Sequence, residues 1–452
     1  MKLASPWAPR LAPGDEPPFE RLAGALADDI AAGLIGPGDR LPAHRDLAWR
    51  LGIGVGTVTK AYARLEQRGL VRSLHGRGMF VAGTSTMGTG SINLGINAPP
   101  QMLSDRLLQA TLAILAKRLD AETFGAYSHP AGQPEHRRLI ARWLAGRGVD
   151  AEPDRTLLTH GAQQALAIAL AMACPPGTRL LTEALTYPGA LLVARQAGLE
   201  IVGLAMDEEG LTTDALAEAL GADHGQRRVL YVTPTLHNPT TATMSAERRQ
   251  AVARLCHAHD VIIIEDDVYG IFAPPGVRPL ASLAPERTFH VAGLSKALSP
   301  GLRMGALVVP PDCVAEAEAR LQASCTTASA LQGEIMRIWL TDGTAEAVAS
   351  SIRADAVRRS ALAAERLPKQ AGLKVNGGFH AWLPMATEAA DRFVARAALR
   401  GVALMPARAA MADPSAPEGG VRISLGAPTI AQLGQALDIL SDLFRPGRPV
   451  LV

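Results

Sequence analysis

Short apolar runs alternate with amphipathic stretches from residue 92 to the end of the chain, and this alternation restricts the possible fold most strongly. Strands that alternate with helices are typical of α/β domains with a mostly parallel sheet. Four runs have the length of buried strands, and a helical pattern over 162–173 follows the first: residues 156–159, 179–182, 229–232 and 261–264. Because such sheets bind ligands at the carboxyl ends of their strands, the residues after these runs are the candidates for a site.

The composition excludes several classes of protein. With 452 residues, the chain is long enough for two or three domains. No apolar run reaches the roughly 18 residues of a membrane span, and the first ten residues lack the apolar core of a signal peptide. We therefore expect a cytoplasmic protein with no membrane partner. The four cysteines form no Cys-x-x-Cys pair, which argues against a zinc site and a disulfide framework: Cys174, Cys256, Cys313 and Cys325.

The first 83 residues have the pattern of a small, mainly helical domain with a β wing. Apolar spacing and glycine positions predict three helices: 19–33, 44–51 and 55–67. Two short helices that meet at a glycine-bearing turn are typical of a helix-turn-helix. Residues 70–73 and 79–81 then alternate like strands on either side of Gly76-Arg77-Gly78, which predicts a hairpin with a cation at its tip.

Positive charge is concentrated in this first part of the chain. Residues 44–78 contain seven basic and two acidic side chains, a net charge of +5, whereas the whole chain carries +2. A compact basic patch on a nearly neutral protein favours a polyanion as partner, and a solvated helical face is the alternative.

Three segments resemble the GntR-type winged helix, and the similarity covers nearly all of 19–82: residues 40–48, 57–65 and 76–81. The resemblance implies double-stranded DNA as partner. It places Arg45, Thr57, Thr59 and Lys60 near the major groove or its phosphates, and Arg77 on the wing toward the minor groove.

The start of the third helix departs from that family. The usual Ser-Arg-x-Thr is Gly54-Val55-Gly56-Thr57 here, so a common guanine-reading arginine is absent and the base preference should differ. A dimerisation module remains the alternative, because helix spacing alone does not require DNA. The small polar residues over 84–91 predict a short linker to the rest of the chain.

Lys296 is the only lysine between 118 and 368, in a chain that takes most of its positive charge from arginine. A lysine amine in a crowded apolar site can lose its proton and attack a carbonyl, which an arginine cannot do. The aldehyde of pyridoxal 5'-phosphate is the natural partner, and Arg303 would hold its phosphate. A surface lysine on a loop is the alternative.

The surrounding Ser-Lys-x-x-x-Pro-Gly-x-Arg-x-Gly frame, from Ser295 to Gly305, resembles the lysine segment of fold-type I pyridoxal-phosphate enzymes, the aspartate aminotransferase superfamily. That family often carries a second serine where this chain has Gly293, so one phosphate-binding hydroxyl is expected to be absent.

The run 261–269 ends in carboxylates, and Asp266 with Tyr269 resembles the family's pair that binds the pyridine nitrogen and the ring hydroxyl. A carboxylate beside the ring nitrogen keeps the ring protonated, which makes the ring an electron sink. A Walker B strand is the first alternative, but no P-loop accompanies it. A two-carboxylate metal site is the second, and it lacks histidine ligands, so we expect no metal.

Further motifs follow the family's order along the chain. The resemblance implies that Asn238 bonds the ring hydroxyl, that the backbone of Gly161, Ala162 and Gln163 receives the phosphate, and that Tyr187 stacks on the ring. It also implies that Tyr127 reaches the phosphate of a neighbouring subunit and that Arg422 binds the α-carboxylate of a substrate. Each signal is weak alone, and their order supports a common site.

A GntR-type winged helix before an aminotransferase-like body resembles the MocR subfamily of transcription regulators. The resemblance implies a winged helix over 1–83, a linker over 84–91, a fold-type I domain over 92–330 with a mostly parallel sheet, and a smaller α+β C-terminal domain over 331–452. It also implies a head-to-tail homodimer. Lys296 would hold the cofactor as an internal aldimine, which an amine or amino-acid effector converts into an external aldimine.

Two other functions remain open at this stage. The chain could be an aminotransferase that retains a DNA-binding head, because the residues for amino transfer are present. It could also be a vitamin sensor whose DNA binding responds to pyridoxal phosphate alone. The sequence names neither the effector nor the promoter.

Overall fold

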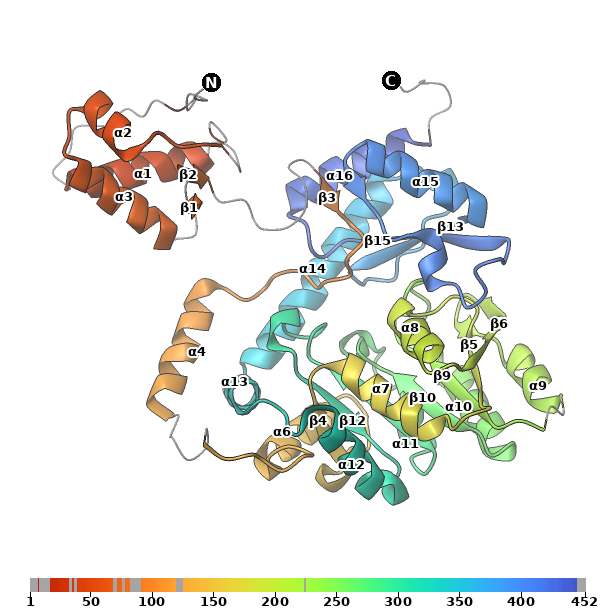
Figure 1. Ribbon diagram of the computed structural model, residues 1–452. Coiled ribbons are helices and arrows are strands. Elements are labelled where there is room, and N and C mark those ends of the chain that lie inside the picture. The colour runs from red at the N-terminus through yellow and green to blue at the C-terminus, as the bar shows by residue number, and fades with distance from the viewer. Residues whose placement is uncertain are drawn as a thin grey trace. The chain divides into compact units, whose positions relative to one another are not determined.

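The computed structural model describes residues 7, 17–31, 35, 39–67, 71–74, 78–81, 91–118, 125–222 and 225–444 (Figure 1). The chain forms two compact units, Met1–Ser91 and Ile92–Val452. The first unit is called the head below and the second the body.

The head contains three helices and a two-stranded antiparallel sheet: α1 (Pro18–Ala31), α2 (His44–Leu51), α3 (Val55–Gln67), β1 (Val71–Leu74) and β2 (Gly78–Val81). The apolar stripes of the helices meet in one core, with Leu22, Leu47 and Leu65 fully buried. Tyr62 is also buried, and its hydroxyl donates to the carbonyl of Pro42, which ties α3 to the segment before α2. The winged-helix prediction is thus confirmed. The wing tip at Arg77 lies outside the described residues.

A seven-stranded sheet forms the centre of the body, in the order β4-β12-β11-β10-β9-β5-β6. Six strands run parallel and β12 runs against both neighbours: β4 (Thr156–Thr159), β5 (Arg179–Glu183), β6 (Glu200–Leu204), β9 (Arg228–Val232), β10 (Ile262–Asp266), β11 (Thr288–Gly293) and β12 (Gly305–Val308). The predicted α/β domain with a mostly parallel sheet is confirmed. A short hairpin, β7 (Met206–Asp207) and β8 (Gly210–Leu211), follows β6.

Helices cover both faces of this sheet (Figure 1). One face packs against α7 (Ala162–Ala173), α8 (Pro188–Gln196) and α12 (Val314–Cys325), and the other against α9 (Thr213–Gly221), α10 (Ala246–Ala258) and α11 (Leu280–Leu283). Neighbouring strand residues belong to opposite cores: Leu180 packs on the side of α7, and Leu181 on the side of α9. Burial on both faces explains why these strands read as continuous apolar runs.

The C-terminal part of the body has its own core. It contains the antiparallel pair β13 (His380–Ala386) and β15 (Glu418–Ser424), covered by α14 (Thr344–Arg366), α15 (Thr387–Leu399) and α16 (Ile430–Asp442). The first strand of the body, β3 (Ile92–Asn93), pairs with β14 (Val402–Ala403). The chain therefore passes from the linker through the C-terminal part before it reaches the large sheet.

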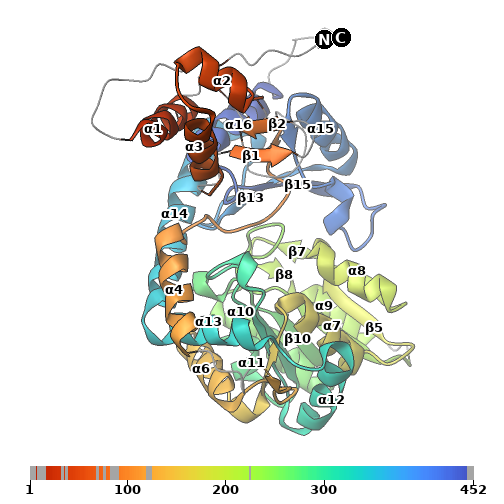
Figure 2. The same ribbon diagram turned by 60° about the vertical axis from the view of Figure 1, so that its left-hand side comes forward.

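The described part of the body contains three further α-helices: α4 (Asp105–Arg118), α6 (Pro134–Ala145) and α13 (Ala330–Thr341). Helix α4 lies beside α13 (Figure 2), where Thr111 accepts a hydrogen bond from the indole of Trp339. On the same helix, Leu108, Leu112 and Ile114 are between 39% and 56% exposed. None of the described helices is long and apolar enough to cross a membrane.

Candidate cofactor site and DNA-binding surface

The strand ends of the large sheet surround a cavity of roughly 430 Å³. Because β4, β5, β9, β10 and β11 are parallel, the loops that follow them meet at one edge. Most of the predicted site residues line the cavity: Ala162, Gln163, Tyr187, Asn238, Asp266, Tyr269, Ser295, Lys296, Arg303 and Arg422. Residues about 260 positions apart along the chain are thus brought together.

Lys296 follows β11 and is partly open to the cavity, whereas its amino group is enclosed by protein. Burial and the nearby guanidinium of Arg422 together lower the pKa of this amine to about 8, although Asp266 acts in the opposite sense. The amine donates a hydrogen bond to the backbone carbonyl of Asn97. A pKa near 8 leaves a useful fraction of reactive free amine close to neutral pH.

Asp266 ends β10 with one carboxylate oxygen unpaired. The hydroxyl of Tyr231 donates to Oδ2 at 2.9 Å, whereas Oδ1 is buried and has no hydrogen-bond partner among the described residues. Burial raises the pKa of Asp266 to about 6, even though the hydrogen bond from Tyr231 acts in the opposite sense. A buried unpaired oxygen is costly, so a donor that approaches from the cavity would be favoured there.

Arg422, on β15, is buried at the side of the cavity opposite the large sheet. Its guanidinium donates to Asn238 Oδ1 at 2.8 Å and to the carbonyl of Gly95 at 2.6 Å. Its Nε is buried without a hydrogen-bond partner in the described part of the chain, and burial lowers its pKa. The arginine therefore retains donor capacity for an anionic group.

The start of α7 and Arg303 form the end of the cavity that suits a phosphate. Gly161, with φ of 78°, precedes the helix, and the Cβ of any other residue there would lie 2.8 Å from Arg303 Nη2. Arg303 also lies 3.4 Å from Ser295 Oγ and donates to the carbonyl of His160. Free helix N–H groups beside a guanidinium are typical of phosphate sites.

The structure also explains the glycine at 293. A Cβ there would approach Ala162 Cβ to 3.1 Å, closer than side chains usually pack. A second serine would therefore crowd the start of α7.

Tyr187, directly before α8, is fixed by Gln163. Its hydroxyl donates to Gln163 Oε1 at 3.0 Å, and Gln163 Nε2 donates to the carbonyl of Gly189 at 3.0 Å. A Cβ at Gly189 would lie 2.4 Å from the tyrosine ring, so only glycine leaves room for this ring position. The side chain of Gln163 thus orients an aromatic ring, a role that the sequence did not indicate.

Among the described candidate residues of the body, Tyr127 is the one that does not lie in or beside the cavity. Its side chain is 87% exposed and lies outside the cavity.

Among the cavity residues that the sequence did not predict, Asn97 and Gly95 form hydrogen bonds with predicted ones. Asn97 is buried, and its amide donates to the hydroxyl of Tyr269 at 2.8 Å. Gly95 contributes the carbonyl that Arg422 binds. Both lie in Gly-Ile-Asn-Ala-Pro-Pro, which begins two residues after the end of β3 and contains none of the motifs described above.

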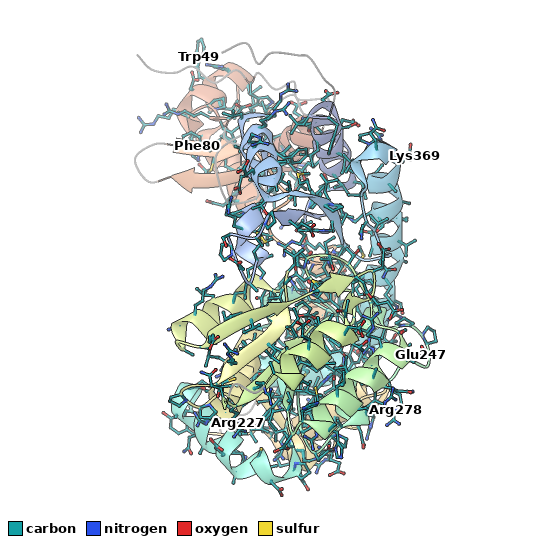
Figure 3. All side chains as sticks on the ribbon, turned by 90° about the vertical axis from the view of Figure 1, so that its right-hand side faces the viewer. Trp49, Phe80, Arg227, Glu247, Arg278 and Lys369 are labelled. Atoms are coloured by element: carbon teal, nitrogen blue, oxygen red, sulfur yellow. The ribbon has the colours of Figure 1, made fainter. Side chains whose placement is uncertain are left out.

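In the head, Arg45, Thr59 and Lys60 are exposed and Thr57 is half-buried. The hydroxyl of Thr59 donates to the carbonyl of Val55 at 3.0 Å, within its own helix. The side chain of Trp49 lies one helical turn after Arg45, is 83% exposed (Figure 3), and was not predicted. Among the described residues of the whole chain, no group of His, Cys, Asp or Glu side chains could hold a metal ion.

Two family models match the chain. Aminotransferase class I and II matches residues 89–440, and the gntR family of bacterial regulatory proteins matches residues 18–81.

Curated relatives of this chain include HTH-type transcriptional regulators. An uncharacterized HTH-type transcriptional regulator, YdeF of Bacillus subtilis, is 30% identical over 97% of this chain and 96% of its own length. The HTH-type transcriptional regulator TauR of Rhodobacter capsulatus is 29% identical over 68% of this chain and 71% of its own. Among solved structures, an archaeal alanine:glyoxylate aminotransferase superposes with a TM-score of 0.73 at 23% identity, over 86% of this chain and 94% of its own, which shows the shared fold.

Proposed function

This chain belongs to the aminotransferase class I and II family and is a GntR-type transcription regulator of MocR architecture, and from this premise we propose that it senses a primary amine at Lys296 with pyridoxal phosphate as cofactor. The observation that carries the proposal is the cavity that joins Lys296, Asp266 and Arg422. These three residues come from distant parts of the chain. The reactive amine of Lys296, the unpaired carboxylate oxygen of Asp266 and the incompletely bonded guanidinium of Arg422 suit different parts of one cofactor–ligand complex.

The residues present fit the cofactor. The backbone N–H groups at the start of α7, with Arg303 and Ser295, would hold the phosphate, and Asp266 Oδ1 would accept a hydrogen bond from the ring nitrogen. Tyr187 would lie against the ring, in an orientation set by Gln163. Pyridoxal phosphate supplies an aldehyde carbon that forms a double bond to one amine nitrogen at a time, either that of Lys296 or that of an incoming amine.

The effector should carry an anionic group besides its amine. Arg422 lies across the cavity, is held in place by Asn238 and Gly95, and keeps its buried Nε without a partner among the described residues. A planar guanidinium binds a carboxylate or sulfonate with two donors. The expected class is therefore amino acids or aminosulfonates, and Arg422 would orient the amine toward Lys296.

A homodimer, head-to-tail as in the family that the chain resembles, would complete the site. The apolar side chains of Leu108, Leu112 and Ile114 on α4 remain exposed, and the exposed Tyr127 lies outside its own cavity. An exposed apolar helix face beside a ligand site is typical of a subunit interface. In this proposal, Tyr127 contributes its hydroxyl to the phosphate of the partner's cofactor.

In the head, the exposed Arg45, Thr59 and Lys60, with Thr57, would contact DNA. The second helix of such a motif enters the major groove, and basic side chains around it neutralise phosphates. The half-buried position of Thr57 leaves its hydroxyl for a backbone contact more readily than for a base edge.

Amino transfer is the second candidate function. The free amine of Lys296, with a pKa near 8, can accept and return a proton, and the residues that would bind an amino acid are in place.

The decisive test is a pair of measurements on the purified protein. A regulator binds operator DNA with an affinity that changes when the amine is added, and its cofactor absorbance shifts once and then stays constant. Repeated turnover with an amino donor and a keto acid, without DNA binding, would refute the regulator and establish the transaminase. DNA binding that responds to pyridoxal phosphate alone would instead establish a vitamin sensor.

A further inference from the structure

Lys296 and Arg422, the two cations proposed to bind the ligand, both donate hydrogen bonds to main-chain carbonyls of one short segment, residues 95–97. Arg422 donates to the carbonyl of Gly95 at 2.6 Å, and Lys296 donates to the carbonyl of Asn97. This segment begins four residues after Ser91, the last residue of the head unit. Any change in the hydrogen bonds of Lys296 or Arg422 therefore acts on the chain close to the point where it leaves for the head.

The residues just before this segment are fixed to the C-terminal part of the body. The amide of Ile92 donates to Gly401 O at 2.7 Å, and the amide of Leu94 donates to Ala403 O at 2.8 Å. The carbonyl of Leu94 in turn accepts from the amide of Ser424 at 2.9 Å. Strand β3 therefore moves with β14 and β15 whenever the C-terminal part moves.

Asn97, in contrast, is bound from both parts of the body: Lys296 and Tyr269 follow strands of the large sheet, and His380 lies on β13 of the C-terminal part. Its carbonyl accepts from Lys296, after β11, and its side-chain amide donates to Tyr269, after β10. The second amide hydrogen points to His380 Nδ1 at 3.3 Å, while His380 Nε2 donates to the carbonyl of His237 at 3.1 Å. Asn97 is thus the residue at which a segment fixed to the C-terminal part is joined to the large sheet.

The amide of Asn97 has a single orientation here. Burial lowers the pKa of His380 to about 3, so its ring is neutral, and the hydrogen on Nε2 leaves Nδ1 as an acceptor. Both amide hydrogens of Asn97 are therefore used, its side-chain oxygen is buried without a partner among the described residues, and its backbone carbonyl accepts from Lys296.

We propose that the hydrogen bond between Lys296 and Asn97 depends on whether the lysine nitrogen is covalently bound. The free amine holds the 95–97 segment by donating to the carbonyl of Asn97, and a covalent bond at the lysine nitrogen removes this hydrogen bond and releases the segment. The step that involves an incoming amine rests on the proposed function. The hydrogen bonds of the segment do not depend on it.

The chemistry of the nitrogen supports this assignment. A free lysine ammonium has three hydrogens that rotate freely, whereas a lysine nitrogen in a double bond to carbon keeps at most one, in a fixed direction. When a primary amine forms the new double bond to the carbon, the bond from that carbon to Lys296 breaks. The two hydrogens of the incoming nitrogen pass to the lysine, which leaves as a free amine. Binding of the incoming amine thus restores Lys296 as a free amine, which donates a hydrogen bond to the carbonyl of Asn97.

Two substitutions of Lys296 separate this role from loss of the covalent bond, because neither product can form that bond. Lys296→Arg keeps hydrogen-bond donors near Asn97, and Lys296→Met has a similar length without donors. Without added amine, the arginine variant should show amide hydrogen exchange over 94–98 that is about fivefold slower or more than in the methionine variant. Its operator affinity should match that of the wild type saturated with amine, and differ from that of the methionine variant by a similar factor. Equal exchange and equal affinity in the two variants would overturn the proposal.

Asn97→Ala provides a second test should the arginine variant misfold. It keeps the backbone carbonyl but removes the amide contacts to Tyr269 and His380, so the segment should exchange faster and the amine should change DNA affinity less than in the wild type. Asn376→Ala is the matched control, since that amide also joins the C-terminal part to the large sheet, through Thr241 and Thr243, but lies far along the chain from the linker. An identical amine response in both variants would contradict a special role for Asn97.

The proposed function and the role of Asn97 can be refuted separately. If the wild type takes up no cofactor and ignores amines, the proposed function is wrong, yet the arginine and methionine variants should still differ in exchange over 94–98. If the wild type responds to an amine but its exchange over 94–98 stays constant, amine sensing stands and the role of Asn97 falls.

Discussion

The head and the body carry their candidate residues in opposite ways. In the head, Arg45 and Lys60 are exposed and lie on different helices. In the body, Asp266 and Arg422 are buried, and each is linked to further residues of the cavity.

This difference determines how each region responds to mutation. Exposed charges act nearly independently, contribute little each, and are screened by salt. Buried charges share partners, so the removal of one leaves others unpaired and the effects do not add. Single substitutions should therefore reduce DNA binding gradually and ligand binding abruptly.

The largest effect is expected for Lys296→Ala. This change removes the only nitrogen in the described part of the cavity that can bond covalently to the aldehyde of the cofactor, so the absorption band of the carbon–nitrogen double bond to the lysine should be absent. Absorption spectra of the purified variant before and after addition of the cofactor measure this directly. Lys374→Ala, at an exposed lysine that pairs with Glu208, should keep the wild-type spectrum. An unchanged spectrum in the Lys296 variant would refute the assignment of this lysine.

Arg422→Gln should have the next largest effect. The loss of one partner from a buried, hydrogen-bonded ion contact costs about 2–5 kcal/mol, so the affinity for an amino acid should fall about 30-fold or more. An amine without an anionic group should bind the variant and the wild type alike. Titration of the cofactor absorbance with an amino acid and with its decarboxylated amine gives both affinities. Arg366→Gln, at an exposed pair with Asp438, is the control, and equal losses for both ligands would contradict the role of Arg422.

The sequence predicted those parts of the molecule in which the structure or the chemistry requires a particular type of residue. The strands of the sheet were predictable because burial on both faces requires apolar runs, and Lys296 because arginine cannot replace a reactive amine. Asn97 and Gly95 were not predictable, since Arg422 and Lys296 contact their backbone carbonyls, which every residue has. The orientation of Gln163 toward Tyr187 depends on packing around Gly189, which no short motif encodes.

Val55→Arg tests whether the head can gain a specific contact between an arginine and a DNA base. Val55 is 44% exposed at the start of α3, where the resembling family carries an arginine, and a bidentate arginine–guanine contact contributes about 1–3 kcal/mol of discrimination. The variant should gain affinity for operator sequences with guanine at the contacted position and lose it for those with thymine, whose methyl group suits a valine. Selection of binding sites from a randomised pool measures this preference. Val357→Arg, at an exposed valine of the body, should leave the preference unchanged.

The pH dependence of cofactor uptake should report the buried environment of Lys296. Only the unprotonated amine attacks an aldehyde, and burial lowers the pKa of Lys296 from its ordinary value near 10.5 to about 8. Below pH 8, the rate of bond formation should therefore rise about tenfold per pH unit, and it should level off above pH 8. Stopped-flow absorbance with free pyridoxal phosphate measures the rate. A rise that continues to pH 10 would mean that the amine is solvated like a surface lysine.

The smallest effect is expected for Lys60→Ala in the head. An exposed lysine that neutralises one phosphate releases about one counterion on binding, so its loss should weaken binding by a similar factor on every DNA sequence. The slope of the logarithm of the binding constant against the logarithm of the salt concentration should fall by about 0.9, and the affinity for the amine should stay the same. Lys369→Ala, at an exposed lysine of the body (Figure 3), should change neither quantity. If Lys60→Ala instead removed binding to one operator and spared others, Lys60 would read a base, and the head would depend on single specific contacts as the body does.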